Sequence, residues 1–224
     1  MSRPVAVLRP EPGNAQTAAR ISERGLTPLC LPLFGIAPLA WTCPDTAGLD
    51  ALIITSANTV RHAGPSLTTL RALPVFAVGA ATAAAARMAG LDVRATGDSD
   101  AAALIDLAAA QGIRNALHLG GREAAVGTGG IIRQTIAVYG SDPIEIDVDR
   151  LRQLAGTVAL LHSARAAVRL GGAVAQAGLD RRALRVAAIS PAVADAAGIG
   201  WDRLETAQTP SDAALIDAAA RLAD

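Results

Sequence analysis

DALIITSANTVRHAG, residues 50–64, is the stretch of sequence that decides the fold. It opens with a short apolar run that predicts a buried strand, continues with a Thr-Ser pair, and ends in a segment that we predict to be helical. A similar stretch, TVALLHSARAAVRLGG, returns at residues 157–172, where Ser163 follows Ser56 by 107 positions. Strands that lead directly into helices are typical of βαβ units, so both stretches predict an α/β fold with parallel sheets.

The rest of the chain repeats in the same way. Apolar runs that alternate with alanine-rich segments predict further strands at PVAVL, PVFAV, NALHL and RVAAI. PVFAVGAATAAAARMAGLDV (74–93) matches RVAAISPAVADAAGIGW (185–201), and GDSDAAALIDLAA (97–109) matches TPSDAALIDAAA (209–220). The openings AVLRPEPG and LHLGGREAAVG also align, and all offsets stay near half of the 224 residues. The sequence therefore predicts an internal duplication of an α/β unit, with two domains that face one another across a cleft.

Composition excludes several classes of protein. The formal net charge is zero, 51% of residues are hydrophobic and 2% are aromatic, which favours a globular chain over a nucleic-acid-binding platform. Every basic residue is arginine, so a Schiff-base or P-loop lysine is excluded. No apolar run approaches the roughly 20 residues that span a bilayer, and MSRPVAVLRP lacks the apolar core of a secretory signal. We therefore expect a cytoplasmic protein that binds neither nucleic acid nor membranes, with Cys30 and Cys43 as buried free thiols.

The residues that follow the predicted strands are nearly all small, hydroxyl-bearing or basic. They are Arg9, Thr55, Ser56, Gly79, Gly120, Gly121, Arg122, His162, Ser163 and Ser190. Ligands of open parallel sheets bind outside the carboxyl ends of the strands, where such residues let the amides of helix N-termini approach an anion. Thr55, Ser56 and Ser163 are also ordinary helix N-caps, so a purely structural interpretation of each stays open.

Standard catalytic motifs are missing from the sequence. The glycine-rich HLGGREAAVGTGGIIRQ has neither the G-x-G-x-x-G nor the Walker A spacing, and no G-x-S-x-G elbow occurs. His62, His118 and His162 lack metal-ligand spacing, and we expect them at the surface or at strand ends. Asp100 and Asp212 begin predicted helices, which fits first-turn and capping roles.

Tyr139 is the only tyrosine of the chain and lies in IAVYGSDPIEID, residues 136–147. We expect a strand-like run to pass there into a turn at 140–143. PLFGIAPL, residues 32–39, is the counterpart in the other half, and both segments are typical of extended, proline-punctuated connectors between domains. From its sequence context alone, Tyr139 is either a half-buried structural tyrosine or a site residue.

In order and spacing these segments resemble the uroporphyrinogen-III synthase family over essentially the whole chain. LRPEPGNAQTAARISERGLTPLCLPLFGI is similar to the family's opening and first linker, and DALIITSANTVRHAG resembles its strand with Thr-Ser-x-x-x-Val. PVFAVGAATAAAARMAGLDV resembles its Val-Gly-x-x-Thr-Ala helix, GDSDAAALIDLA the segment after it, and VYGSDP its Val-Tyr linker. The resemblance implies two flavodoxin-like parallel-sheet domains joined by a two-stranded linker. One domain combines residues 1–33 with 145–224, the other spans 40–138, and the linkers are 34–39 and 139–144.

The resemblance also implies a reaction. The family expels the terminal hydroxyl of hydroxymethylbilane as water and closes the macrocycle through a spiro intermediate that inverts ring D. The implied enzyme is a lyase of tetrapyrrole and heme biosynthesis that needs no cofactor and no metal, and it acts largely by folding its substrate. We expect a monomer that binds this small molecule and makes transient contact with the upstream deaminase.

The same resemblance implies roles for individual residues. By position, Tyr139 matches the family tyrosine that is thought to be the general acid for departure of the hydroxyl. Arg9 and Arg122 are the candidates for binding substrate carboxylates. The other candidates for substrate binding are Thr55, Ser56, Gly79, Thr82, Gly120, Gly121, Ser163, Ser190 and Thr209.

Four positions depart from the family pattern. His162 and Val193 each stand where the second half usually has threonine, Ser190 stands where it usually has glycine, and Gly140 follows Tyr139 in place of a basic residue. These departures leave open a two-lobed protein that closes by hinge motion on a tetrapyrrole or another small anion without cyclising it. A Rossmann-type transferase is a third hypothesis, which the lack of a G-x-G-x-x-G turn disfavours.

Overall fold

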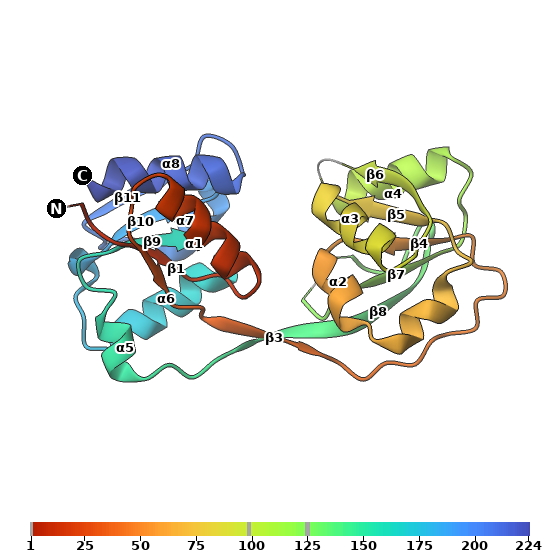
Figure 1. The fold of residues 1–224 in the computed structure, drawn as a ribbon, viewed down its shortest axis with the longest axis horizontal. Helices are drawn as coiled ribbons and strands as arrows, with labels where there is room; N and C mark the ends of the chain where they lie inside the picture. The colour runs from red at the N-terminus through yellow and green to blue at the C-terminus, as the bar shows by residue number, and fades with distance from the viewer. Residues whose placement is uncertain (1, 98–99, 124–125) are drawn as a thin grey trace. The chain divides into compact units, whose positions relative to one another are not determined.

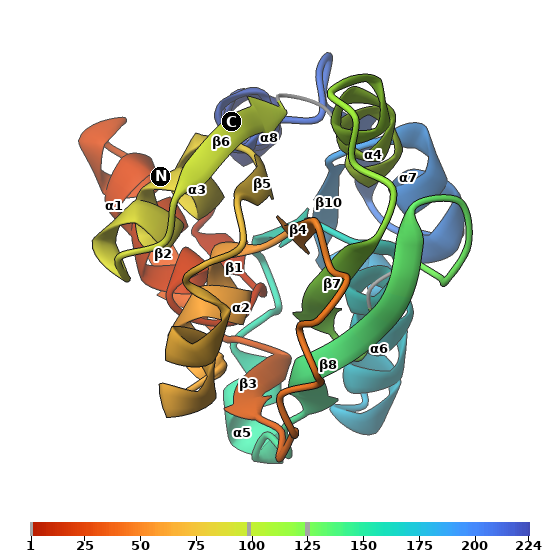
Figure 2. The same ribbon diagram turned by 90° about the vertical axis from the view of Figure 1, so that its right-hand side faces the viewer.

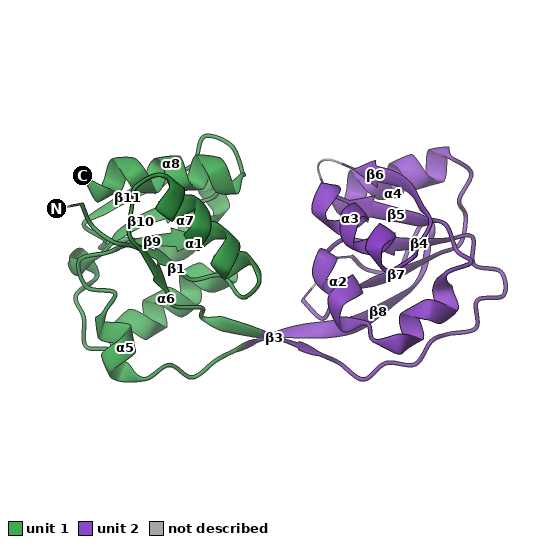
Figure 3. Cartoon of the chain, viewed as in Figure 1, with its two compact units in different colours: residues 1–35, 143–224 green, residues 36–142 purple. Residues whose placement is uncertain are grey.

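The chain divides into two compact units, which Figure 3 shows in different colours. Unit 1 comprises residues 1–35 and 143–224, and unit 2 comprises residues 36–142. The computed structural model describes residues 2–97, 100–123 and 126–224. The chain therefore leaves unit 1 early and returns to it only after the whole of unit 2.

Unit 1 is built on a five-stranded sheet with the strand order β11-β10-β9-β1-β2, and its neighbouring strands are parallel. The strands are β1 Val5–Val7, β2 Pro28–Cys30, β9 Val158–Leu161, β10 Arg185–Ala188 and β11 Arg203–Thr206. The helices are α1 Gly13–Glu23, α5 Val148–Arg152, α6 Ala164–Gln176, α7 Pro191–Ala197 and α8 Asp212–Ala223, with a 3-10 turn η2 Arg181–Ala183. Because β1 lies between β9 and β2, the two separate chain segments of unit 1 share one sheet (Figure 1).

Helices bury both faces of this sheet. Successive side chains of a strand point to opposite faces, and in β9 Ala159 and Leu161 pack with α6 and α7, whereas Val158 and Leu160 pack with α1 and α8. Burying one such aliphatic side chain contributes about 2 kcal/mol to stability. A strand buried on both faces needs apolar residues at every position, which explains the uninterrupted run VALL.

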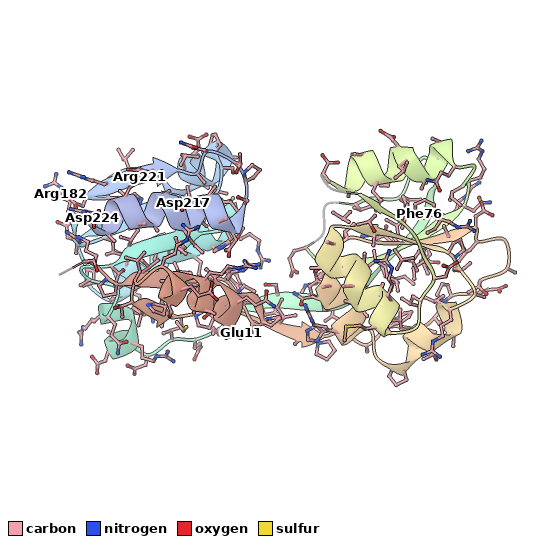
Figure 4. All side chains as sticks on the ribbon, turned by 45° about the horizontal axis from the view of Figure 1, so that its top comes forward. Glu11, Phe76, Arg182, Asp217, Arg221 and Asp224 are labelled. Atoms are coloured by element: carbon pink, nitrogen blue, oxygen red, sulfur yellow. The ribbon has the colours of Figure 1, made fainter. Side chains whose placement is uncertain are left out.

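The outer face of α8 carries charged side chains instead. Asp217 and Arg221, both labelled in Figure 4, pair with Arg24 and Glu205. These side chains are well exposed, so the pairs contribute at most about 1 kcal/mol each. The stability of this helix therefore depends on its buried face.

Unit 2 is built on a six-stranded sheet with the strand order β3-β8-β7-β4-β5-β6. The strands are β3 Phe34–Pro38, β4 Ala51–Ile54, β5 Val75–Val78, β6 Val93–Gly97, β7 Ala116–Gly121 and β8 Ile132–Pro143. The helices are α2 Ala57–His62, α3 Ala80–Met88 and α4 Ala101–Ala110, with a 3-10 helix η1 Pro65–Leu70. The strands from β8 to β6 are parallel, and the long β8 runs beside β7 (Figure 2).

Both faces of this second sheet are also covered. Leu52 and Ile54 of β4 pack with α2, η1 and α3, whereas Ala51 and Ile53 pack on the face of α4. Phe76, which Figure 4 labels within unit 2, is almost wholly buried on the α4 face. Each unit thus has a sheet between two helical layers and its own hydrophobic core.

The predicted α/β class with parallel sheets is confirmed. All six strands predicted from apolar runs are present, as β1, β4, β5, β7, β9 and β10. The sequence pattern missed β2, β6 and β11, which are edge strands with half-buried or exposed residues. An edge strand buries less apolar surface, so it lacks the continuous apolar run on which the prediction depends.

The turn predicted at residues 140–143 is wrong. β8 continues through these residues to Pro143. Backbone pairing explains the continuation, because Arg122 N–H donates to the carbonyl of Tyr139 (2.8 Å) and Ile144 N–H donates to the carbonyl of Leu33 (3.2 Å). Gly140 and Pro143, which the prediction took as turn residues, are therefore strand residues.

Four strands of each sheet follow the same order when the strands are matched by the sequence repeat. The repeat pairs β4 with β9, β5 with β10, and β7 with β1. Under this matching the order β7-β4-β5-β6 of unit 2 corresponds to β1-β9-β10-β11 of unit 1. Similar segments of sequence therefore occupy similar places in their sheets.

Both cysteines are free thiols, but the expectation that they are buried is wrong for Cys30. Cys30 ends the edge strand β2 and is exposed, while Cys43 is half-buried. In the described part of the chain, the helices are all too short or too polar to cross a bilayer.

Candidate functional site

The carboxyl edge of the unit 2 sheet gathers most of the residues that were predicted from the strand ends. β4 lies between β5 and β7, and β7 lies next to β8, so the ends of these four parallel strands meet along one edge. The predicted residues at this edge are Thr55, Ser56, Gly79, Gly120, Gly121, Arg122 and Tyr139.

Thr55 is the first residue after β4 and is half-buried. Its Oγ1 lies 3.2 Å from Nε2 of His118, which is a wholly buried residue of β7. The expectation that His118 lies at the surface or at a strand end is therefore wrong. Burial lowers the pKa of His118 to about 4, because the charged imidazolium loses its hydration inside the unit.

Tyr139 lies against Gly121 across the β7–β8 pair. Gly120 is opposite Ala137 and Gly121 is opposite Tyr139, so β8 carries one extra residue, Val138, at a bulge. As a result both Val138 and Tyr139 pack on the same hydrophobic cluster, although neighbouring strand residues normally face opposite ways. A Cβ at Gly121 would lie 2.7 Å from Cζ of Tyr139, so only glycine leaves room for this ring.

Two further side chains lie in this part of the edge. The imidazole of His62, at the end of α2, has its centroid 6.1 Å from that of the Tyr139 ring. The guanidinium of Arg122 bonds to the carboxylates of Asp142 and Glu123. Arg122 is thus already paired with two acids, although its side chain is well exposed.

Gly140 stands where the family has a basic residue, and the guanidinium of Arg122 lies close to this position. An added Cβ at Gly140 would lie 2.9 Å from Nη2 of Arg122, so the guanidinium occupies the space that a side chain at 140 would need. A basic group therefore lies at the position that follows Tyr139, but it comes from the end of β7.

The remaining predicted residues of unit 2 have mainly structural contacts. The Oγ of Ser56 caps α2 by accepting a hydrogen bond from Asn58 N–H (3.2 Å). Gly79 precedes α3 with a φ of +79°, a conformation that favours glycine, and its N–H donates to the carbonyl of Gly97 (2.7 Å). Thr82 lies in the first turn of α3 and is only 5% exposed, so its side chain offers little surface to a ligand.

A cluster of charged and polar side chains around Asp212 lies at the carboxyl edge of the unit 1 sheet. Asp212 is the first residue of α8, and its Oδ1 accepts hydrogen bonds from Thr17 (2.9 Å) and His162 (2.8 Å). Its Oδ2 accepts from Arg20 (2.6 Å), and Arg9 Nη1 lies 3.5 Å from Oδ1. We call these five residues the Asp212 cluster.

The charges of the Asp212 cluster follow from burial and hydrogen bonding. Burial alone would raise the pKa of Asp212, but hydrogen bonds from His162, Arg20 and Thr17 hold it well below its usual value. Burial lowers the pKa of His162 despite its bond to Asp212, and the charge of Arg9 lowers it further. At neutral pH an uncharged His162 therefore donates its Nε2–H to an ionised Asp212.

Arg9, a candidate for a substrate carboxylate, belongs to this cluster. Its guanidinium packs over Gly13, where an added Cβ would lie 2.5 Å from Nε, and it faces Asp212 and Thr17. An internal carboxylate therefore already holds the arginine that was predicted for the substrate.

The other unit 1 candidates follow β9, β10 and β11. The Oγ of Ser163 caps α6 by accepting from Ala166 N–H (3.2 Å), whereas Ser190 precedes α7 without a capping bond from its side chain. Thr209 Oγ1 lies 3.3 Å from the Oγ of Ser211, the residue that caps α8. Asp212 thus occupies the first turn of α8 as predicted, while Ser211 provides the cap.

Sequence reasoning missed two features of these edges. It assigned Asp212 only a first-turn role, although this residue joins Arg9, Thr17, Arg20 and His162. It also missed the contact between His118 and Thr55, which are 63 positions apart. Both sets of contacts depend on the order in which the parallel strands pair. The pattern of apolar residues in the sequence does not reveal this order.

Comparisons with known proteins assign the chain to a family. The family model described as uroporphyrinogen-III synthase HemD matches residues 15–217. The fold is similar to that of uroporphyrinogen-III synthetase from Helicobacter pylori, with a TM-score of 0.64 and 17% identity over 99% of this chain and 100% of that one. A mutant uroporphyrinogen III synthase from Thermus thermophilus has a TM-score of 0.52 and 18% identity over 99% and 98%. No curated protein sequence gives a match.

The family match covers most of the chain, and the two solved structures have the same type of fold. The chain belongs to the uroporphyrinogen-III synthase family. This is a family of cofactor-independent cyclising lyases of tetrapyrrole and heme biosynthesis.

Proposed function

We propose that this chain cyclises hydroxymethylbilane to uroporphyrinogen III, with loss of water and inversion of ring D. The family match over residues 15–217 is the observation that carries the proposal. The carboxyl edge of unit 2 supports it, because this edge carries a tyrosine, hydroxyl groups and helix N-termini. These groups suit a substrate that must lose a hydroxyl and that carries many carboxylates.

Tyr139 is the proposed general acid. Its phenol donates a proton to the terminal hydroxyl of the substrate, which departs as water and leaves a protonated, cationic azafulvene. Ring D then attacks through its substituted carbon to give the spiro intermediate, and rearrangement with loss of a proton to the phenolate of Tyr139 closes the inverted macrocycle. An electron-rich pyrrole drives the departure, so the protein mainly has to hold the chain of rings in the folded arrangement.

Substrate carboxylates are the proposed ligands of the strand-end groups. In unit 2 these are the hydroxyls of Thr55 and Ser56, the backbone at Gly79, Thr82, Gly120 and Gly121, and the guanidinium of Arg122. In unit 1 they are the hydroxyls of Ser163, Ser190 and Thr209, and the guanidinium of Arg9. The guanidinium groups of Arg9 and Arg122 already pair with Asp212 and Asp142, so each would have to bind a substrate carboxylate in addition to its own acid.

We further propose that both units are flavodoxin-like and arose by internal duplication. The shared strand order under the sequence repeat supports this history. The proposed domains remain residues 1–33 with 145–224, and 40–138, with the linkers 34–39 and 139–144. A cytoplasmic location, a monomeric state and a transient contact with the upstream deaminase also remain predictions.

An isomer assay tests the proposed function. Hydroxymethylbilane is generated in situ from porphobilinogen with the deaminase, the protein is added, and the oxidised porphyrins are separated. We expect the type III isomer to dominate, because uncatalysed closure gives type I. Type I alone from a folded preparation would reject the cyclase and favour the binding protein without turnover.

A further inference from the structure

His118 contacts the candidate site although no site residue was predicted there. It lies in β7 between β4 and β8, opposite Ile53 on one side and Thr135 on the other. The residue is 0% exposed, so its imidazole cannot touch a ligand itself. Its Nε2 lies 3.2 Å from Oγ1 of Thr55, which is half-buried at the carboxyl edge.

The position of the imidazole hydrogen follows from the surroundings of the ring. With a pKa lowered to about 4 by burial, His118 is neutral near pH 7 and carries one N–H. Nδ1 is buried and finds no hydrogen-bond partner within the described residues. Buried N–H groups without a partner are rarer than unsatisfied acceptors. The hydrogen therefore belongs on Nε2, where it is donated to Oγ1 of Thr55.

We propose that His118 is a positioning residue that turns the hydroxyl of Thr55 into an outward donor for a substrate carboxylate. A threonine hydroxyl has one hydrogen and two lone pairs, and the Nε2–H of His118 occupies one lone pair. The hydroxyl hydrogen is then left for a ligand, and within the described residues Thr55 has no other side-chain partner. This inference rests on the proposed function, in which Thr55 binds the substrate.

The tautomer is tested first, without reference to activity. In protein labelled with ¹⁵N at histidine, we expect His118 to show a protonated Nε2 and an unprotonated Nδ1 at pH 7. The Thr55→Val variant should shift the Nε2 resonance more than the Nδ1 resonance. A protonated Nδ1 in the folded protein would overturn the inference, because Thr55 would then donate its hydrogen inward.

Kinetics with hydroxymethylbilane test the consequence for binding. His118→Leu removes the donor, and we expect KM to rise about tenfold with kcat little changed. A hydrogen bond to a charged ligand contributes enough binding free energy to account for a tenfold or larger change in affinity. His118→Gln keeps an N–H near the place of Nε2 and should restore most of the affinity. Thr55→Val should raise KM as His118→Leu does, and the double variant should lose no more than Thr55→Val alone.

A matched control separates positioning from packing. Thr59 is another wholly buried polar residue of unit 2, with its Oγ1 3.5 Å from the carbonyl of Leu119. Thr59→Val should leave KM unchanged. If the wild type is active, equal effects of Thr59→Val and His118→Leu on KM would overturn the inference. Additive effects of Thr55→Val and His118→Leu on KM would overturn it as well. A wild-type protein that gives only type I would instead reject the proposed function, whatever the tautomer.

Discussion

Nε2 of His162 lies 2.8 Å from Oδ1 of Asp212, and this contact joins the end of β9 to the first residue of α8. Both side chains are largely buried, at 12% and 14% exposed. The departure from threonine at position 162 is thus matched by a carboxylate that can hold an imidazole. Threonine is too short to replace histidine in this contact, so we interpret the two residues as a pair.

The first prediction concerns the carboxylate of the Asp212 cluster. Asp212→Asn should lower the free energy of unfolding by about 2–4 kcal/mol, because it breaks a largely buried, charge-assisted network and leaves Arg20 facing an amide. Urea denaturation at pH 7 measures this loss. Asp217→Asn on the exposed face of the same helix is the control and should cost less than about 1 kcal/mol. Equal losses for the two variants would mean that the cluster adds nothing beyond a surface pair.

The second prediction is a loss of stability in acid that arises from His118. The unfolded chain binds a proton at this histidine near pH 6.5, whereas the folded chain does so only near pH 4. Between these values only the unfolded state is protonated, so stability present above pH 6.5 is lost as the pH falls. One pKa unit corresponds to about 1.4 kcal/mol, so the full loss is about 3 kcal/mol.

Denaturation curves of the wild type and His118→Gln between pH 7 and 4 isolate this effect. His162 also has a lowered pKa and contributes in the same direction, so some acid sensitivity should remain in the variant. On acidification from pH 7 to 4, the unfolding free energy of the wild type should fall by about 3 kcal/mol more than that of the variant. A constant difference would show that His118 does not resist protonation.

The third prediction concerns the close contact of Gly121 with Tyr139. Gly121→Ala forces the ring to move and should cost about 1–3 kcal/mol of stability, with a loss of turnover as well. Gly127→Ala is the control, since an added Cβ there meets no atom within 4 Å. In a Tyr139→Ala background the cost of Gly121→Ala should largely vanish. Persistence of the full cost would place the clash elsewhere.

The fourth prediction tests the phenol of Tyr139 itself. Tyr139→Phe keeps the ring over Gly121, so the fold and its melting temperature should change little. Loss of a general acid should lower kcat about 100-fold, with production of the type III isomer measured against the spontaneous type I background. Unchanged turnover would remove Tyr139 from the mechanism, and the tyrosine would then be a structural residue.

The fifth prediction separates capping from ligand binding at two matched serines. Ser163 caps α6 through its Oγ, whereas Ser190 makes no capping bond to α7. Ser163→Ala should therefore cost about 1 kcal/mol of stability, and Ser190→Ala only a few tenths. If Ser190 binds the substrate, its variant should raise KM without a change in melting temperature. A loss of stability at Ser190 as large as at Ser163 would contradict this assignment.

The buried strands were predictable from sequence because each is packed on both faces. VALL and ALII are uninterrupted apolar runs, and such runs occur where helices cover both sides of a sheet. The edge strand β11, with its exposed Arg203 and half-buried neighbours, has no such run and was missed. The extent of β8 was also missed, since Gly140 and Pro143 favour turns locally and only pairing with neighbouring strands keeps them extended.

The candidate site was predictable only in part, because the sequence shows where strands end but not how they pair. The position after each strand was enough to select Thr55 and Gly121, because the ends of parallel strands meet at one edge. The bulge at Val138, which turns Tyr139 toward Gly121, depends on a register that the sequence does not reveal. Likewise, nothing near Asp212 in sequence indicates that it would meet His162, which is 50 positions away.

The path of the chain through unit 1 imposes an order of assembly during synthesis. β1 pairs with β9 at Val5 and Val158, so β1 waits during synthesis for a partner that is made much later. At about 5–20 residues per second this wait lasts roughly ten seconds or more. Unit 2 is continuous and has all of its strands by Pro143, so it can close in the meantime. The nascent β1 segment is therefore exposed to chaperones and proteases until β9 emerges to pair with it.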